Sequence, residues 1–203
     1  MSLDALFEQL KHPNPNLRDR ASLEIAENRD ETTVPRLMGL IDNEDVELRR
    51  TAVKVLGVIG PDAVPALTRG LKSVDVTIRT SCSKSLAQLA SNFPDDEIPA
   101  ETIAALKAGT DDENPMVQLV SVMALGQMGT AAWDALTEVL KATDNPAVGV
   151  AIVNALGSSG DERSIAVLQA LTTDETVDAY VRESAVSALP RLDQVINYKK
   201  GAW

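Results

Sequence analysis

The sequence is poor in the side chains that catalytic and metal sites use most often. Its 203 residues include one histidine, His12, and one cysteine, Cys82. A single cysteine excludes an intramolecular disulfide framework. These two residues also cannot supply the four ligands of a structural zinc site or an iron–sulfur cluster. We therefore predict no catalytic residue, no metal site and no intrinsic cofactor.

Aromatic residues, long apolar runs and positive charge are also scarce. Aromatic side chains make up 3% of the chain, so the core must be built from Ala, Val, Leu and Ile. No stretch approaches the roughly 18 apolar residues of a membrane span, and Met1–Leu10 does not resemble a signal peptide. A net charge of −11 argues against binding to nucleic acid, whose phosphates attract clustered Lys and Arg. These features predict a cytoplasmic protein without membrane insertion.

What the chain does contain is a repeated helical unit, seen most clearly in Asp45–Leu67. Asp45 is a suitable N-cap, and apolar residues follow at helical spacing as far as Ile59. Gly60 ends this helix and Pro61 opens the next. Since neither helix can bury its apolar stripe alone, the unit needs neighbours of the same shape.

Six copies of this unit align on the position of Leu56, at spacings of 31, 30, 39, 31 and 33 residues. Eleven residues before that position, each copy has an Asn or Asp, the preferred N-caps. These residues are Asn14, Asp45, Asp75, Asn114, Asn145 and Asp178. The pattern predicts an all-α fold: an α-solenoid of about six HEAT-like helical hairpins, a right-handed superhelix with the second helices on its inner face.

The predicted repeat domain spans residues 1–192, followed by a C-terminal tail, 193–203. The longest spacing indicates an insertion at 91–99, interpreted as a solvated loop or hinge. Cys82 aligns with core alanines, so we expect it to be buried. In the tail, Tyr198 and Trp203 are a weaker candidate contact surface.

Helical phase predicts which side chains of each second helix point outward. In the second copy these are Glu47, Arg50, Thr51 and Lys54, and in the third Thr77, Thr80, Ser81 and Lys84. In the fourth they are Met116, Leu119, Val120 and Met123, and in the fifth Ala147, Val150, Ala151 and Asn154. The last two sets carry no charge. Such a helix is either covered by other parts of the protein or binds a partner or ligand.

Basic residues precede this apolar surface along the array. The predicted partner or ligand surface therefore consists of Arg50, Lys54, Arg79, Lys84, Met116, Leu119, Val120, Met123, Val150 and Asn154. It would suit a bilin, with its apolar rings and propionates, or a partner helix with acidic residues. Four arginines recur in register: Arg18, Arg49, Arg79 and Arg182. We favour a structural role for them, in which they bond acids or carbonyls between repeats.

Three segments carry a resemblance to a known family. They are LGVIGPDAVPAL (Leu56–Leu67), LGQMGTAAWDAL (Leu125–Leu136) and LGSSGDERSIAVL (Leu156–Leu168), together with the aliphatic–Arg pairs that include Leu48-Arg49. They resemble the HEAT-like repeats of the phycobilisome lyase family. Copies four and five depart from the pattern, with Gln118 and Gly149 in place of the arginine.

The resemblance implies two alternative functions. The family includes bilin lyase subunits of the CpcE/CpcF type, the phycobilisome-degradation protein NblB, and IaiH, which partners an iron–sulfur assembly protein. We favour a non-catalytic scaffold that docks a protein partner, either a phycobiliprotein or a cofactor-assembly protein. An iron–sulfur cluster could then only be shared with that partner. The alternative is a bilin lyase or bilin-carrying subunit that positions phycocyanobilin.

Overall fold

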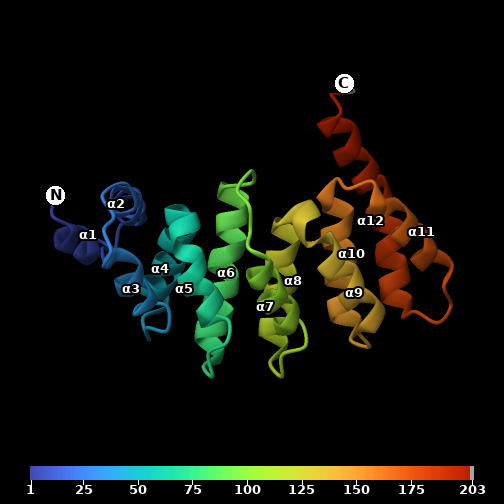
Figure 1. The fold of residues 1–203 in the computed structure, drawn as a ribbon, viewed down its shortest axis with the longest axis horizontal. Coiled ribbons are helices and arrows are strands. Elements are labelled where there is room, and N and C mark those ends of the chain that lie inside the picture. Colours follow the sequence, from blue (N-terminus) through green and yellow to red (C-terminus); the bar gives the residue numbers. More distant parts are fainter. Residues whose placement is uncertain (202–203) are drawn as a thin grey trace. The chain divides into compact units, whose positions relative to one another are not determined.

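The computed structural model describes residues 1–201, which form twelve α-helices and two short 3-10 helices, without a strand (Figure 1). The helices pair into six consecutive hairpins, α1 with α2 through to α11 with α12. The prediction of an all-α solenoid of helical hairpins is confirmed. The chain divides into two compact units, Met1–Glu97 and Ile98 onward, and the division falls in the insertion between the third and fourth hairpins.

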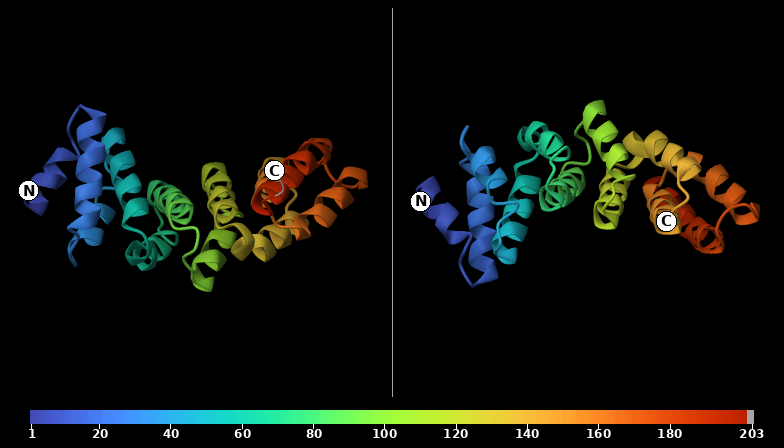
Figure 2. Two further views of the ribbon diagram at one scale, coloured as in Figure 1. Left: turned by 90° about the horizontal axis from the view of Figure 1, so that it is seen from above. Right: turned by 90° about the horizontal axis from the view of Figure 1, so that it is seen from below.

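The first unit contains three hairpins. Its elements are α1 (Leu3–Gln9), α2 (Pro15–Glu27), α3 (Thr33–Met38), α4 (Val46–Ile59), η1 (Pro61–Ala63), α5 (Val64–Gly70) and α6 (Val76–Asn92). The second helices of the hairpins stack on one another, α2 on α4 and α4 on α6. The blue α2 and the cyan α4 lie side by side in Figure 2.

The second unit repeats this arrangement. Its elements are α7 (Ala100–Gly109), α8 (Pro115–Gln127), η2 (Gly129–Ala132), α9 (Trp133–Ala142), α10 (Pro146–Ser159), α11 (Arg163–Thr173) and α12 (Ala179–Lys199). Here α10 packs between α8 and α12. The stacking is close because small residues face each other: a Cβ on Gly126 would lie 2.9 Å from the Cβ of Ala155.

Each second helix begins at the predicted Asn or Asp cap, and all six caps are confirmed. The Asp45 Oδ1 atom, for example, accepts hydrogen bonds from the backbone N–H groups of Glu47 (2.9 Å) and Leu48 (3.2 Å). A cap of this kind is worth about 1 kcal/mol. The caps therefore set the residue at which the second helix of each hairpin begins.

The core is the column of apolar residues predicted from the repeat. The aligned position is fully buried in five copies, as Ile25, Leu56, Leu86, Leu125 and Leu156, and half-buried in the sixth, as Leu189. In the last helix Leu192 is fully buried instead. Cys82 also lies in the core as predicted, and burial raises the pKa of its thiol to about 12. The thiol is therefore a small apolar packing group.

Two segments differ from their predicted form. Ser91 and Asn92 belong to α6 rather than to a loop, and the Asn92 amide donates a hydrogen bond to the Gly57 carbonyl (3.1 Å). The expected tail from residue 193 continues α12 as far as Lys199, because Ile196 is buried and the Lys199 amine donates to the Ser159 carbonyl (2.8 Å). Trp203 lies outside the described residues. Among residues 1–201, no helix is long and apolar enough to cross a membrane.

Candidate interaction surfaces on the second helices

The outward face of the second helices in the first unit is polar and largely self-paired. Arg50 is exposed and forms an ion pair with Glu47 (3.1 Å), and Lys54 pairs with Asp19 on α2 (2.8 Å). Lys84 is also exposed. The predicted basic positions are therefore on the surface, but Arg50 and Lys54 already have acidic partners within the unit.

Three side chains predicted to point outward are buried instead. Thr51, Ser81 and Val120 are 8%, 5% and 5% exposed. All three occupy the same position, six residues after the N-cap, so one error of helical phase accounts for all of them. The two hydroxyls are satisfied by carbonyls, Thr51 donating to Glu47 (2.7 Å) and Ser81 to Ile41 (2.8 Å).

The in-register arginines bond backbone carbonyls, as favoured from the sequence, and the carbonyls are those of the loop in front of their own helix. The Arg79 guanidinium donates to the carbonyls of Ser73 (2.8 Å) and Val74 (3.1 Å), just before its own N-cap. Arg18, Arg49 and Arg182 make the equivalent bonds. Arg18 also reaches the next repeat, through an ion pair with Glu47 (3.3 Å). Because Arg79 is half-buried and braces a loop, we leave it out of the candidate surface.

On α8 of the second unit, three apolar side chains form an exposed stripe. Met116, Leu119 and Met123 are 54%, 38% and 49% exposed, and α8 carries no charged residue. We call these three residues the α8 stripe. Such a stripe is unusual on a solvent-facing helix, whose outer face is normally charged. The open alternative of a covered helix therefore does not hold for these side chains within the described residues.

Next to α8, the helix α10 presents small residues, and α12 packs on the other side of α10. A shallow groove of about 510 Å³ lies between these two helices. It is lined by Pro146, Ala147, Val150 and Asn154 of α10 and by Tyr180, Glu183, Ser184 and Ser187 of α12. Asn154 is engaged by Arg191, which donates to its side-chain oxygen (3.0 Å).

Sequence reasoning missed Tyr180, a residue that lines this groove and is 72% exposed. The signal was available, because Tyr180 stands two residues after its N-cap, as Met116 and Ala147 do in their copies. The α8 stripe, Val150 and Tyr180 together present apolar surface on three successive second helices.

A polar cluster at the turn between α10 and α11 is structural. The Arg163 guanidinium lies 4.3 Å from the Trp133 ring centroid and pairs with Asp161 (2.6 Å). The hydrogen bond from Arg163 outweighs burial and lowers the pKa of the Asp161 carboxyl below its ordinary value of 3.8. Trp133 also donates to the Ser164 hydroxyl (3.0 Å), so the cluster joins α9 to α11.

The side chains that could hold a metal ion do not gather in the described part of the chain. Within 1–201, no three His, Cys, Asp or Glu side chains are grouped closely enough to hold a metal ion. His12 stands in a turn, where its Nδ1 atom accepts a hydrogen bond from the Asn14 backbone N–H (3.0 Å).

Comparison with known proteins gives a family for this architecture. The HEAT repeats family matches residues 3–87 and 103–190. The "uncharacterized phycocyanin operon protein Z" of Pseudanabaena tenuis is 46% identical over 201 residues, which cover 98% of this chain and 100% of that protein. The bilin biosynthesis protein CpeZ of a Synechococcus strain is 39% identical over 107 residues, 52% of this chain and 58% of CpeZ.

Among solved structures, the fold is similar to the complex of CpcE and CpcF of phycocyanin lyase from a Nostoc species. The TM-score is 0.51 at 20% identity, over 75% of this chain and 96% of that chain. At this identity the likeness concerns the fold alone. From the repeats and the full-length relative together, the chain belongs to the HEAT-repeat family that includes the phycocyanin operon protein Z.

Proposed function

We propose that this protein is a non-catalytic docking subunit that binds a phycobiliprotein during the handling of its bilin. The observation that carries the proposal is the α8 stripe, an exposed apolar row on a helix without charge. Full burial of a Leu or Met side chain is worth about 1.5–3 kcal/mol, so three half-exposed ones offer roughly 3 kcal/mol to a partner. Two unbranched methionines in this row allow it to fit partners of slightly different shape.

The names of the relatives support the choice of partner. The full-length relative is described as a phycocyanin operon protein, and the half-length relative as a bilin biosynthesis protein. The name of neither relative refers to an iron–sulfur partner.

The second candidate is a bilin lyase or bilin-carrying subunit. It is supported by the bilin biosynthesis relative and by the physical argument that adding a bilin to an acceptor cysteine needs mainly positioning. The basic residues that would meet the bilin propionates are Arg50, Lys54 and Lys84. Two of them are already paired with acids, which weakens this reading relative to docking.

The test is binding to purified phycocyanin by the wild-type chain and by two matched variants. Met123→Glu places a charge in the α8 stripe, and we expect at least a tenfold loss of affinity because the carboxylate must be desolvated in the interface. Leu23→Glu is the control: Leu23 stands at the same position of the first copy, nine residues after the cap, and is 55% exposed. Both variants should keep the wild-type helicity and melting temperature.

Equal affinities for the wild type and Met123→Glu would contradict docking through the α8 stripe. Gel filtration with free phycocyanobilin separates the two candidates. A co-eluting bilin with a red-shifted absorbance, lost in Lys84→Ala, would favour the bilin-carrying alternative. Binding of phycocyanin without binding of free bilin supports the docking subunit.

A further inference from the structure

Five of the six second helices carry a side chain that braces the loop in front of them. Four residues after the N-cap, Arg18, Arg49, Arg79, Gln118 or Arg182 donates a hydrogen bond to a carbonyl of that loop. In the fourth copy the Gln118 amide replaces the guanidinium and donates to the Asp112 carbonyl (2.7 Å). The contact is thus kept even when the residue type changes. We call it the loop brace.

The fifth copy is the exception, because Gly149 occupies the bracing position and has no side chain. Its neighbour explains the glycine: a Cβ at Gly149 would lie 2.9 Å from the Cγ2 atom of Val181 on α12. Among residues 1–201, no side chain donates a hydrogen bond to the carbonyls of Thr143 or Asp144, the two that a brace would reach. The loop before α10 therefore lacks the donor that every other copy supplies.

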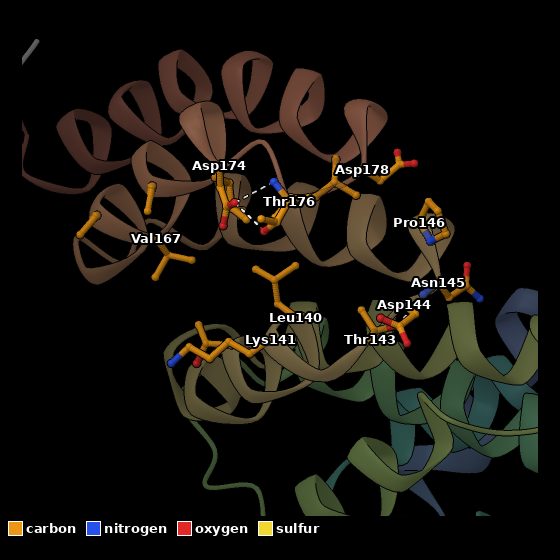
Figure 3. A pocket seen from close by; sticks show the side chains of 16 residues that line it. Leu140, Lys141, Thr143, Asp144, Asn145, Pro146, Val167, Asp174, Thr176 and Asp178 are labelled. Atoms are coloured by element: carbon orange, nitrogen blue, oxygen red, sulfur yellow. Dashed lines mark hydrogen bonds between the residues drawn. The ribbon is translucent and has the colours of Figure 1, made fainter.

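The unbraced loop borders a cleft of the second unit, with a volume of about 980 Å³ (Figure 3). The cleft opens between the C-terminal parts of α9 and α11, whose N-terminal ends are joined by the hydrogen bond from Trp133 to Ser164. Leu140 projects from α9 toward α11 in Figure 3. The apolar lining comprises Leu140, Ala166, Val167, Ala170, Leu171, Val177 and Val181.

Acidic residues dominate the charged groups around this apolar lining. The carboxylates are those of Asp144, Asp174 and Asp178, against one amine, Lys141. Asp174 and Asp178 are engaged locally, since each accepts hydrogen bonds that shape the turn before α12. Asp144 has no hydrogen bond or ion pair from its side chain among residues 1–201 and is exposed. One carboxylate and two carbonyls at the cleft therefore have no donor.

We propose that this cleft binds a segment of a partner protein in which an arginine is flanked by apolar side chains. The guanidinium of that arginine takes the role of the absent loop brace: it donates to the loop carbonyls and pairs with Asp144, while its apolar neighbours lie against Leu140 and Val167. Guanidinium suits this place better than ammonium, because its planar fork bonds several oxygens at once and is less strongly hydrated. The proposal does not depend on the α8 stripe, since it concerns the other helices of the unit.

The test uses three short peptides and the full chain. Acetyl-Leu-Arg-Leu-amide is titrated into the protein while the methyl resonances of Leu140, Val167 and Val177 are followed by NMR. The citrulline peptide keeps the shape and loses the charge, and the lysine peptide keeps the charge and loses the fork. We expect saturable shifts at these methyls with the arginine peptide, and at least about fivefold weaker binding of the other two, since charge-assisted bidentate bonds are roughly twice as strong as neutral ones.

A pair of matched variants completes the test. Asp144→Asn should weaken the arginine peptide about fivefold or more, because it removes the unpaired carboxylate. Glu44→Gln is the control, since Glu44 also stands one residue before its N-cap but in a copy braced by Arg49. It should bind the peptide as the wild type does.

Three results would overturn the proposal. These are equal binding of the arginine and citrulline peptides, equal binding of the arginine and lysine peptides, or an unchanged affinity in Asp144→Asn. Because this readout uses no phycobiliprotein, its failure leaves the docking function untouched. Conversely, loss of phycocyanin binding in Met123→Glu says nothing against the cleft.

Discussion

The loop brace offers a quantitative test of how a repeat array holds its own turns. In the second copy, the Arg49 guanidinium donates to the Asn43 carbonyl at 2.6 Å, and the side chain is half-buried. Changing Arg49 to Met keeps most of the apolar stem and removes the donor. A hydrogen bond from a charged group is worth about 1.5–3 kcal/mol. Since water reaches part of this side chain, we expect a loss near the lower value, about 1.5 kcal/mol.

The fourth copy predicts a partial rescue. Gln118 makes the same contact with a neutral amide, so Arg49→Gln should recover roughly half of the loss, as a neutral hydrogen bond contributes about 0.5–1.5 kcal/mol. The exposed neighbour Arg50, whose partner is Glu47, is the control. Arg50→Met should change stability little, because exposed ion pairs contribute little.

Urea unfolding followed by circular dichroism at 222 nm measures these differences as shifts of the midpoint. Thermal unfolding measures the same differences as shifts of the melting temperature. For a unit of this size, a loss of about 1.5 kcal/mol corresponds to a fall of roughly 6–12 °C. The reasoning is refuted if Arg49→Met and Arg50→Met are equally stable, or if Arg49→Gln is no better than Arg49→Met.

Three further predictions follow from other contacts. Cys82 should not react with Ellman's reagent at pH 8 in the folded protein and should react fully in denaturant, because its thiol is buried with a pKa of about 12; fast labelling of folded protein would contradict its burial. Gly149→Ala should destabilise the protein by about 1–3 kcal/mol in urea unfolding through the clash with Val181, and Val181→Ala in the same chain should cost less than the two changes summed. The pKa of Asp161 is lowered on folding by Arg163, so its contribution to stability is present above the ordinary value of 3.8 and is lost as the pH falls below it. Acid unfolding of Asp161→Asn should therefore show a smaller loss of stability below pH 3.8 than the wild type. If the stability of the two proteins falls in parallel with pH, the Asp161 carboxyl does not cause the loss.

The positions of the helices could be predicted from the sequence because they depend on local interactions. An N-cap acts on backbone N–H groups two or three residues ahead, so the cap at Asp45 or Asn114 depends on its own neighbourhood and not on the rest of the fold. The core column also follows from periodicity, because Leu56 and Leu125 repeat at the spacing that a helix needs. The number of hairpins, their order and the buried cysteine were predictable for the same reason.

Contacts between helices decided the rest. Whether Val120 is exposed or buried depends on a small difference of helical phase that only the neighbouring helices set, and the same holds for Thr51. The end of α12 remains helical because Ile196 and Lys199 pack on residues far away in the sequence, which the composition of the segment does not reveal. Its polar, basic character resembles that of a frayed tail.

The two candidate surfaces also differ in how far the sequence predicts them. The exposed stripe of Met116 and Met123 follows from the sequence alone, because an uncharged helix with a buried column on one side must present apolar residues on another. The cleft between α9 and α11 does not. It depends on Val181 lying against Gly149, a contact between residues of different repeats. The absence of a loop brace in the fifth copy can be recognised only from the hydrogen bonds that the other copies make, such as those of Arg49 and Arg79. Sequence thus determined the helices and their caps through short-range hydrogen bonds and periodicity, whereas the spaces between helices came from side-chain packing in three dimensions.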